Sequence, residues 1–105
     1  MLVHHLVFLA AGLAVAGNAL ADDGAALANS HNCMTCHAID SKKLGPAFKD
    51  VAIKYKDDKN AAVMLEKKVR NGGGGAWGKM PMPATAQSVS DADIKNIVQW
   101  VLTLK

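Results

Sequence analysis

The sequence predicts a small all-α domain of four helices. Apolar residues recur three and four positions apart in four segments of the 105-residue chain, which is the spacing of one face of a helix. Residues that favour helix ends bound these segments. No segment has the pattern of a convincing strand.

The first 21 residues differ from the rest of the chain. They contain no Asp, Glu, Lys or Arg, and an apolar run over residues 6–16 leads into the triplet Ala19-Leu20-Ala21. A small-x-small triplet of this kind is typical of a signal peptidase site. The alternative is an uncleaved membrane anchor, because the whole segment approaches the ~20 residues that span a bilayer. We expect a signal peptide at residues 1–21 and a mature domain at residues 22–105.

Two helices are expected in the first half of the mature domain. The first covers residues 23–32 and begins with acidic side chains, which suit the positive end of the helix dipole. The second follows Pro46, which is suited to the first helical turn. One face of this second helix carries an apolar stripe made of Phe48, Val51, Ala52 and Tyr55.

Two further helices are expected in the second half. The third covers residues 59–70 and ends at Asn71-Gly72, a typical helix stop. The fourth follows Ser90, which forms a capping-box pattern with Asp93. Trp100 lies off the centre of its buried face, where it could cover a neighbouring helix. The expected inward faces are Ala62, Leu65 and Val69 on the third helix, and Ile94, Ile97, Val98, Val101 and Leu102 on the fourth.

Residues 33–37 read CMTCH and contain the only two cysteines of the chain. A structural zinc site needs four ligands, and no second cysteine pair follows. A thiol–disulfide oxidoreductase normally carries its C-x-x-C motif in a thioredoxin-like sheet, which this sequence does not predict. Covalent haem uses all three residues: Cys33 and Cys36 add to the two vinyl groups, and His37 is placed under the iron. The motif therefore favours haem c over the two alternatives.

A haem of this kind needs a second iron ligand, and the stretch GGGGAWGKMPMPATAQSV between the last two helices offers one. It is too long for a simple connector, and such loops are usually functional or disordered. Met82 lies between Pro81 and Pro83, whose rings restrict the backbone and would present the thioether in one direction. Met80 is the rival and ranks second. For Met34 and Met64 we expect the ordinary role of core filler.

Other residues are candidates for supporting the haem pocket. Trp77 is either simple core or a hydrogen-bond donor to a haem propionate. Arg70 is either a second propionate partner or a solvated residue at a helix end. The glycines at 72–75 are either slack or allow close approach of the backbone to haem. His31 is expected to be an exposed polar residue. The cleft itself should be lined by Phe48, Leu65, Trp77 and Met82, with Cys33 and Cys36 pointing into it.

The chain resembles the small bacterial class I cytochromes c, most closely the cytochrome c-551 type. The resemblance is carried by CMTCHAID, KKLGPAFKDVAIKY, VRNGGGGAWGKMPMP and IVQWVLTLK. It implies four helices wrapped around one covalently bound haem c, with the first and last helices crossing. It also implies that Cys33 and Cys36 hold the haem, that His37 and Met82 are the axial ligands, that the Pro46 carbonyl accepts a hydrogen bond from His37, and that Trp77 bonds a propionate.

The chain departs from the family just after Met82. The family often has Pro-Asn after Met-Pro, whereas this chain reads Ala84-Thr85 there and carries about two extra residues before Ser90. A side-chain amide that would steady the methionine sulfur is therefore missing.

The resemblance implies an electron carrier and not an enzyme. It would be a periplasmic, monomeric protein with no stable membrane insertion after signal cleavage. Its partners would be a donor such as a membrane cytochrome complex and an acceptor such as a terminal oxidase or nitrite reductase. The alternative is a haem-based enzyme or sensor whose sixth coordination site opens.

Charge and exposed apolar residues bear on its partners. The net charge of +3 comes from scattered lysines, so nucleic-acid binding is not expected. The expected docking patch for redox partners consists of Met34, Thr35, Leu44 and residues 80–83, with Lys42, Lys43 and Lys79 as a charged rim.

Overall fold

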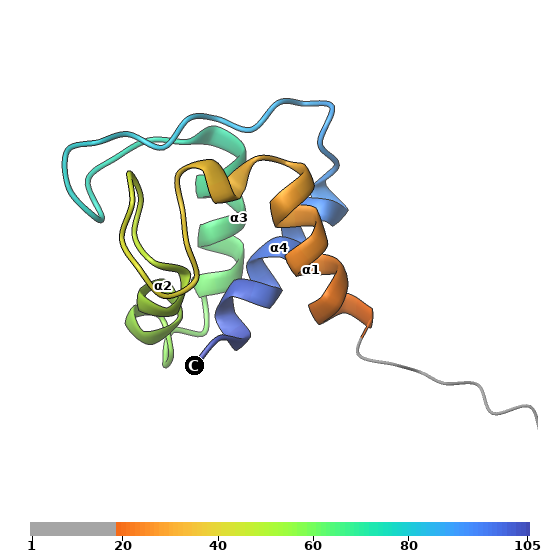
Figure 1. Cartoon of the computed structure of the whole chain (residues 1–105), viewed down its shortest axis with the longest axis horizontal. Helices are drawn as coiled ribbons and strands as arrows, with labels where there is room; N and C mark the ends of the chain where they lie inside the picture. The colour runs from red at the N-terminus through yellow and green to blue at the C-terminus, as the bar shows by residue number, and fades with distance from the viewer. Residues whose placement is uncertain (1–18) are drawn as a thin grey trace, which may run out of the picture.

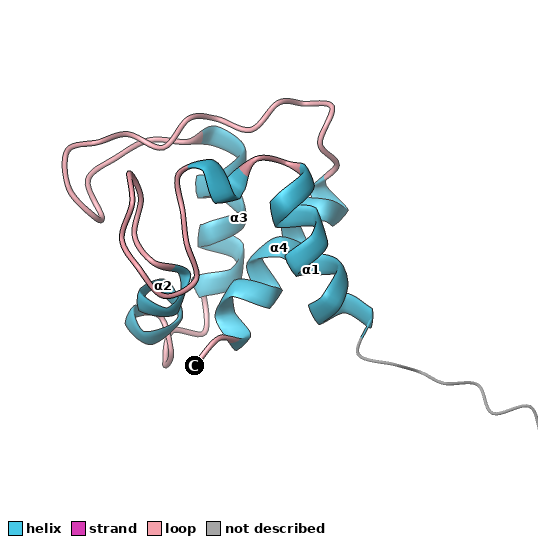
Figure 2. Ribbon diagram, viewed as in Figure 1, coloured by secondary structure: helices cyan, strands magenta, loops and turns pink. Residues whose placement is uncertain are grey.

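The structure is a computed structural model that describes residues 19–105, so the expected signal peptide lies almost entirely outside the described part. Helices and loops make up this part of the chain (Figure 2). Within residues 19–105 the one β-type pairing is an isolated bridge between Gly73 and Met82. The all-α prediction is confirmed. The elements in order are α1 (Ala19–Ser30), the 3-10 helix η1 (Cys33–Thr35), α2 (Phe48–Lys54), α3 (Ala61–Asn71) and α4 (Asp91–Thr103).

Helices α1 and α4 cross, and α3 lies on the other side of α4 (Figure 1). The crossing depends on Gly24, because a Cβ there would lie 2.3 Å from Trp100 Cβ and 2.6 Å from the Asn96 carbonyl oxygen. Trp100 is only 8% exposed, and its ring meets that of Phe48 edge-on with the ring centres 5.5 Å apart. Trp100 therefore covers the neighbouring helix, as expected, and also links α4 to α2.

Helix α4 contributes to both hydrophobic clusters of the core, which confirms its predicted buried face. One cluster joins α4 to α1 and α2, and the other joins α4 to α3 and the segment before α4. The first consists of Ala28, Phe48, Val51, Ile97, Trp100 and Val101. The second consists of Val89, Ile94 and Val98, with Ala62, Leu65 and Val69 of α3 packed against it.

Two helix ends agree with the sequence. The Ser90 hydroxyl accepts a hydrogen bond from the Asp93 backbone N–H at 3.1 Å, which is the expected cap of α4. Gly72 ends α3 with a φ of +70°, a conformation that favours glycine. Local residues therefore determine where α3 ends and where α4 begins.

The start of α2 corrects one expectation. Pro46 does not lie in its first turn, because Ala47 is extended (φ −58°, ψ 139°) and the helix begins at Phe48. The N–H groups of Phe48 and Lys49 donate to the carbonyl oxygens of Ala38 and Ile39, at 2.9 and 3.1 Å. The first free N–H groups of the helix are therefore satisfied by carbonyl groups of an earlier segment of the chain.

The first helix is also shifted from the expected residues 23–32. It begins at Ala19 and ends at Ser30, because Asn32 adopts the left-handed conformation with φ +65°. The CMTCH motif then starts in the short helix η1. Among the described residues, no helix has the length and apolarity that crossing a membrane requires.

Candidate functional site

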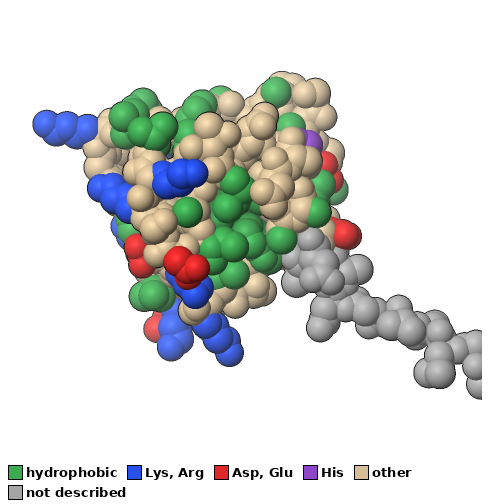
Figure 3. All heavy atoms as spheres, in the orientation of Figure 1, with side chains coloured by type: hydrophobic (Ala, Val, Ile, Leu, Met, Phe, Trp, Pro, Cys, Tyr) green, Lys and Arg blue, Asp and Glu red, His purple; other side chains and the backbone are tan. Residues whose placement is uncertain are grey.

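One cavity of about 750 Å³ opens between η1, α2, α3 and the loop that follows α3. This volume falls within the usual range for ligand and cofactor sites. In Figure 3 hydrophobic side chains gather in the middle of the viewed face, with Lys and Arg side chains along its left and lower border. The lining includes most of the residues expected from the sequence, namely Cys33, Cys36, His37, Pro46, Phe48, Leu65, Trp77 and Met82, but not Arg70.

The two cysteines reach this cavity from a tight turn. The N–H groups of Cys36 and His37 both donate to the Cys33 carbonyl oxygen, at 3.2 and 3.0 Å. This turn brings Cys33, Cys36 and His37 to the lining of the same cavity. Both cysteines are half-buried, free thiols.

The environment of Cys33 bears on the alternative uses of the motif. Burial raises the pKa of the Cys33 thiol above its ordinary value, and the negative charge of a Cys36 thiolate would raise it further. Catalytic cysteines of thiol oxidoreductases instead have a lowered pKa. For zinc, no three His, Cys, Asp or Glu side chains within residues 19–105 are grouped to hold a metal ion. The cavity thus suits an apolar cofactor with two attachment points better than either alternative.

The His37 ring is held from three sides. Its Nδ1 lies 2.7 Å from the Pro46 carbonyl oxygen, the contact that the resemblance implies. A carbonyl can only accept, so Nδ1 carries the proton and Nε2 keeps a lone pair for a metal. The ring stacks on Phe48 with centres 4.7 Å apart, and a Cβ at Gly45 would lie 2.5 Å from His37 Cε1. The imidazole is therefore oriented before any metal binds.

Met82 lines the cavity from the loop after α3. The Met82 N–H donates to the Gly73 carbonyl oxygen, and the Gly73 N–H donates to the Met82 carbonyl oxygen, both at 2.9 Å. Met80 also lines the cavity, but it is 64% exposed, whereas Met82 is half-buried. The geometry therefore favours Met82 over Met80 as the thioether that faces a cofactor.

Trp77 lines the mouth of the cavity and is 40% exposed. Lys54, which sequence reasoning missed, ties this part of the loop to α2. Its Nζ lies 4.6 Å from the centre of the Trp77 ring and donates to the Ala76 carbonyl oxygen at 3.2 Å. The indole is thus steadied by a cation on its face.

Arg70 is not where a propionate partner would be, because it does not line the cavity. Lys68, two positions earlier on α3, lines it instead. Two positions along a helix correspond to a rotation of about 200°, so these side chains leave opposite sides of α3. The sequence shows that Lys68 and Arg70 point in opposite directions from the helix. Which of them faces the cavity depends on the rotation of α3, and that rotation follows from packing.

Two smaller expectations are also corrected. Met64 is 39% exposed and lines the cavity, so it is not core filler. His31 is half-buried, and its Nε2 lies 3.1 Å from Asp93 Oδ2, which links the segment after α1 to the first turn of α4. Sequence reasoning missed this pair because its members are far apart along the chain.

Comparison with known proteins decides the family. The Cytochrome c family model matches residues 21–105. Cytochrome c-552 of Nitrosomonas europaea is 49% identical over 98 residues, which cover 93% of this chain and 92% of that protein. The chain belongs to the cytochrome c family. Cytochrome c-551 of Pseudomonas aeruginosa is 42% identical over 100 residues, or 95% of this chain and 94% of that one.

Solved structures agree. The crystal structure of wild-type Nitrosomonas europaea cytochrome c552 matches with a TM-score of 0.73 and 48% identity, over 77% of this chain and 99% of that one. The class 1 cytochrome MtoD of Sideroxydans lithotrophicus ES-1 matches with a TM-score of 0.69 and 34% identity, over 79% and 94%. The class I cytochrome c fold and the resemblance to cytochromes c-551 and c-552 are confirmed.

A cytochrome c of this family binds one covalently attached haem c, and the residues of this chain fit that group. Two thiols in C-x-x-C spacing line a mainly apolar cavity together with a pre-oriented imidazole and a thioether. The chain is a small monohaem cytochrome c of an electron-carrier family.

Proposed function

We propose that this cytochrome is a periplasmic carrier of single electrons, not an enzyme, and works between a respiratory donor and a terminal oxidase or reductase. The observation that carries the proposal is that two thiols, one imidazole and one thioether all line the same cavity. A membrane cytochrome complex is the kind of donor we have in mind, and an oxidase or nitrite reductase the kind of acceptor.

Cys33 and Cys36 hold the haem covalently in this proposal. When haem is bound, each thiol would have added across one vinyl double bond, with its sulfur on one vinyl carbon and its hydrogen on the other. The addition needs no oxidant or reductant. The two-residue spacer and the tight turn closed on the Cys33 carbonyl support these roles.

His37 and Met82 are the proposed axial ligands. Bound haem supplies a one-electron iron couple. His37 offers Nε2, because Nδ1 is engaged with Pro46. Met82 offers a soft thioether, which favours the reduced iron and leaves no open position for small ligands. If the same two protein ligands stay on the iron in both oxidation states, the site rearranges little when an electron enters or leaves. This suits electron transfer and not chemistry on a substrate.

The mouth of the cavity supports two further roles. Lys68 and Trp77 line it from α3 and from the loop, and each carries N–H donors that suit a haem propionate. Next to it, Leu44 and Met80 are 59% and 64% exposed. We propose that these side chains, with Met34, Thr35 and residues 81–83, form the apolar patch on which redox partners dock.

Export rests on the leader sequence. Residues 1–21 carry the pattern of a signal peptide, and the family match begins at residue 21. Helix α1 begins at Ala19, so cleavage after Ala21 would shorten this helix by three residues. We propose that the mature domain begins at Asp22 and acts as a monomer.

The test is to express the full chain in a host that attaches haem c in its periplasm. We expect a protein of residues 22–105 with one haem in its mass spectrum. The reduced form should not bind carbon monoxide, because both axial positions are filled. Rapid carbon monoxide binding by the intact protein would instead support an enzyme or sensor with an opening sixth site.

A further inference from the structure

The segment after Met82 is fastened to the end of α3 at three successive points. The first is the bridge between Gly73 and Met82. The second is the Thr85 N–H, which lies 3.2 Å from the Val69 carbonyl oxygen and 3.3 Å from that of Arg70. The third is the Arg70 side chain, which reaches beyond Thr85.

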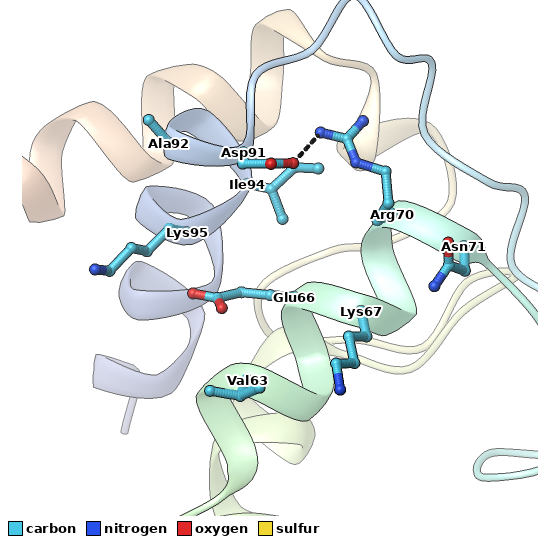
Figure 4. Close-up of a pocket in the computed structure, with 9 residues that line it drawn as sticks. All are labelled: Val63, Glu66, Lys67, Arg70, Asn71, Asp91, Ala92, Ile94 and Lys95. Atoms are coloured by element: carbon cyan, nitrogen blue, oxygen red, sulfur yellow. Dashed lines mark hydrogen bonds and ion pairs between the residues drawn. The ribbon is translucent and has the colours of Figure 1, made fainter.

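The Arg70 guanidinium holds three acceptors on the far part of this segment. It donates to the carbonyl oxygens of Ala86 and Val89 at 3.0 and 2.7 Å, and to Asp91 Oδ1 at 2.7 Å. Figure 4 shows Arg70 reaching from α3 towards Asp91 at the start of α4. Lysine cannot reproduce this contact, because only the planar guanidinium presents several donors in a fixed fork.

The two carbonyl bonds are the important part of this contact. The Arg70 side chain is 16% exposed and Val89 is buried, so the bond to the Val89 carbonyl oxygen is shielded from water, whereas the bond to the Ala86 carbonyl oxygen is exposed. The Asp91 side chain is 96% exposed, and exposed ion pairs contribute little. A hydrogen bond from a charged donor to a shielded carbonyl is stronger than a neutral one.

We infer that Arg70 is a positioning residue for Met82, an inference that rests on the proposed ligand role of Met82. Ala86 lies only four residues after Met82, so fixing its carbonyl limits how far the Met82 backbone can move away from Gly73. The segment has no helix or strand between the bridge and Ser90. Without the Arg70 bonds, Thr85 is the one remaining backbone link to α3 beyond the bridge.

The test is the limiting rate at which imidazole enters the ferric holoprotein. At saturating imidazole this rate reports how often Met82 leaves the iron, and not the affinity for imidazole. We expect Arg70→Gln to raise it by about tenfold or more, the equivalent of ~1.4 kcal/mol. Lys67→Gln, which removes the same charge from an exposed position of α3, should leave the rate unchanged.

A second control separates local release from general loss of stability. Leu27→Ala weakens the core packing of α1 and does not line the cavity. If it raises the imidazole rate as much as Arg70→Gln at an equal fall in melting temperature, Arg70 has no special link to Met82. Amide hydrogen exchange at Met82 and Gly73 gives an independent reading, and we expect it to accelerate in Arg70→Gln but not in Leu27→Ala.

Two further variants test the inference even if Arg70→Gln folds poorly. Asp91→Asn should change the imidazole rate less than twofold, and Arg70→Lys should fall between the parent and Arg70→Gln. A large effect of Asp91→Asn with none of Arg70→Lys would overturn the role of the carbonyl bonds. If the parent lacks the sulfur-to-iron charge-transfer band of the ferric state, the ligand role of Met82 fails instead, so the two failures are distinguishable.

Discussion

Gly73 and Met82 face each other as an antiparallel pair in which each N–H donates to the carbonyl oxygen of the other at 2.9 Å. The pair closes the loop that passes over the mouth of the cavity between α3 and Met82. It attaches the backbone of the proposed ligand to the C-terminal end of a helix. Because the loop has no helix or strand of its own, this bridge determines the position of the Met82 backbone from which the thioether side chain extends.

Gly72 should be essential to this arrangement. Its φ is +70°, and a Cβ there would lie 2.4 Å from the Met82 carbonyl oxygen. Gly75 has a φ of +102° but open space around it, so Gly75→Ala is a control for backbone strain alone. We expect Gly72→Ala to lower the free energy of unfolding by about 1–3 kcal/mol more than Gly75→Ala, because a backbone atom must move. Equal losses in denaturant melts of the two holoproteins would show that the contact with Met82 is unimportant.

Met82→Ala should open the iron, and Met80→Ala should not. We expect Met82→Ala to bind carbon monoxide when reduced and to lose the sulfur-to-iron charge-transfer band. Its reduction potential should fall by a sizeable part of the ~0.8 V that axial ligands span. Met80→Ala should keep both the band and the potential, since Met80 is largely exposed. The reverse pattern would assign the ligand role to Met80.

Gly45 should control the orientation of His37. A Cβ at Gly45 would lie 2.5 Å from His37 Cε1, whereas one at Gly74 in the same cavity would have its nearest neighbour at 3.5 Å. Neither position has a left-handed backbone, so the pair isolates the steric effect. We expect Gly45→Ala to cost about 1–3 kcal/mol of stability and to shift the reduction potential, because the imidazole must turn away from Pro46. Gly74→Ala should be close to the parent in both measurements.

Docking should depend on lysines near the cavity mouth. Lys43 is a poor probe of the charged rim, because its Nζ donates to the Met34 carbonyl oxygen at 3.1 Å and so also holds the haem-attachment turn. Lys42 and Lys79 are exposed, and their joint reversal to Glu should slow electron transfer to an acidic partner at low salt. The loss should shrink as the Debye length falls towards ~8 Å at physiological ionic strength.

A matched reversal controls for net charge. Lys59 and Lys105 are exposed and do not line the cavity. The double variant Lys59→Glu with Lys105→Glu has the same net charge as the rim variant. If both variants slow the reaction equally at every ionic strength, net charge alone steers the encounter and the rim has no part in docking.

Local sequence was enough to predict that four helices form and to name most of the expected cavity residues. The spacing of Ile94, Ile97 and Val98 predicted the buried face of α4, because helical periodicity is a property of neighbouring residues. The cap at Ser90 and the stop at Gly72 are equally local. The CMTCH motif indicated haem because its three reactive groups lie within five residues.

Contacts between distant segments were decided only by the tertiary structure. Helical spacing places Lys68 and Arg70 on opposite sides of α3, but packing against α4 determines which of them lines the cavity. The sequence suggested that Trp100 covers a neighbouring helix, but nothing in it marked Gly24 as the contact that sets the crossing of α1 and α4. Periodicity gives the relative direction of side chains within a helix. The rotation of that helix and its neighbours depend on how all the apolar faces pack together at once, and no single segment contains that information.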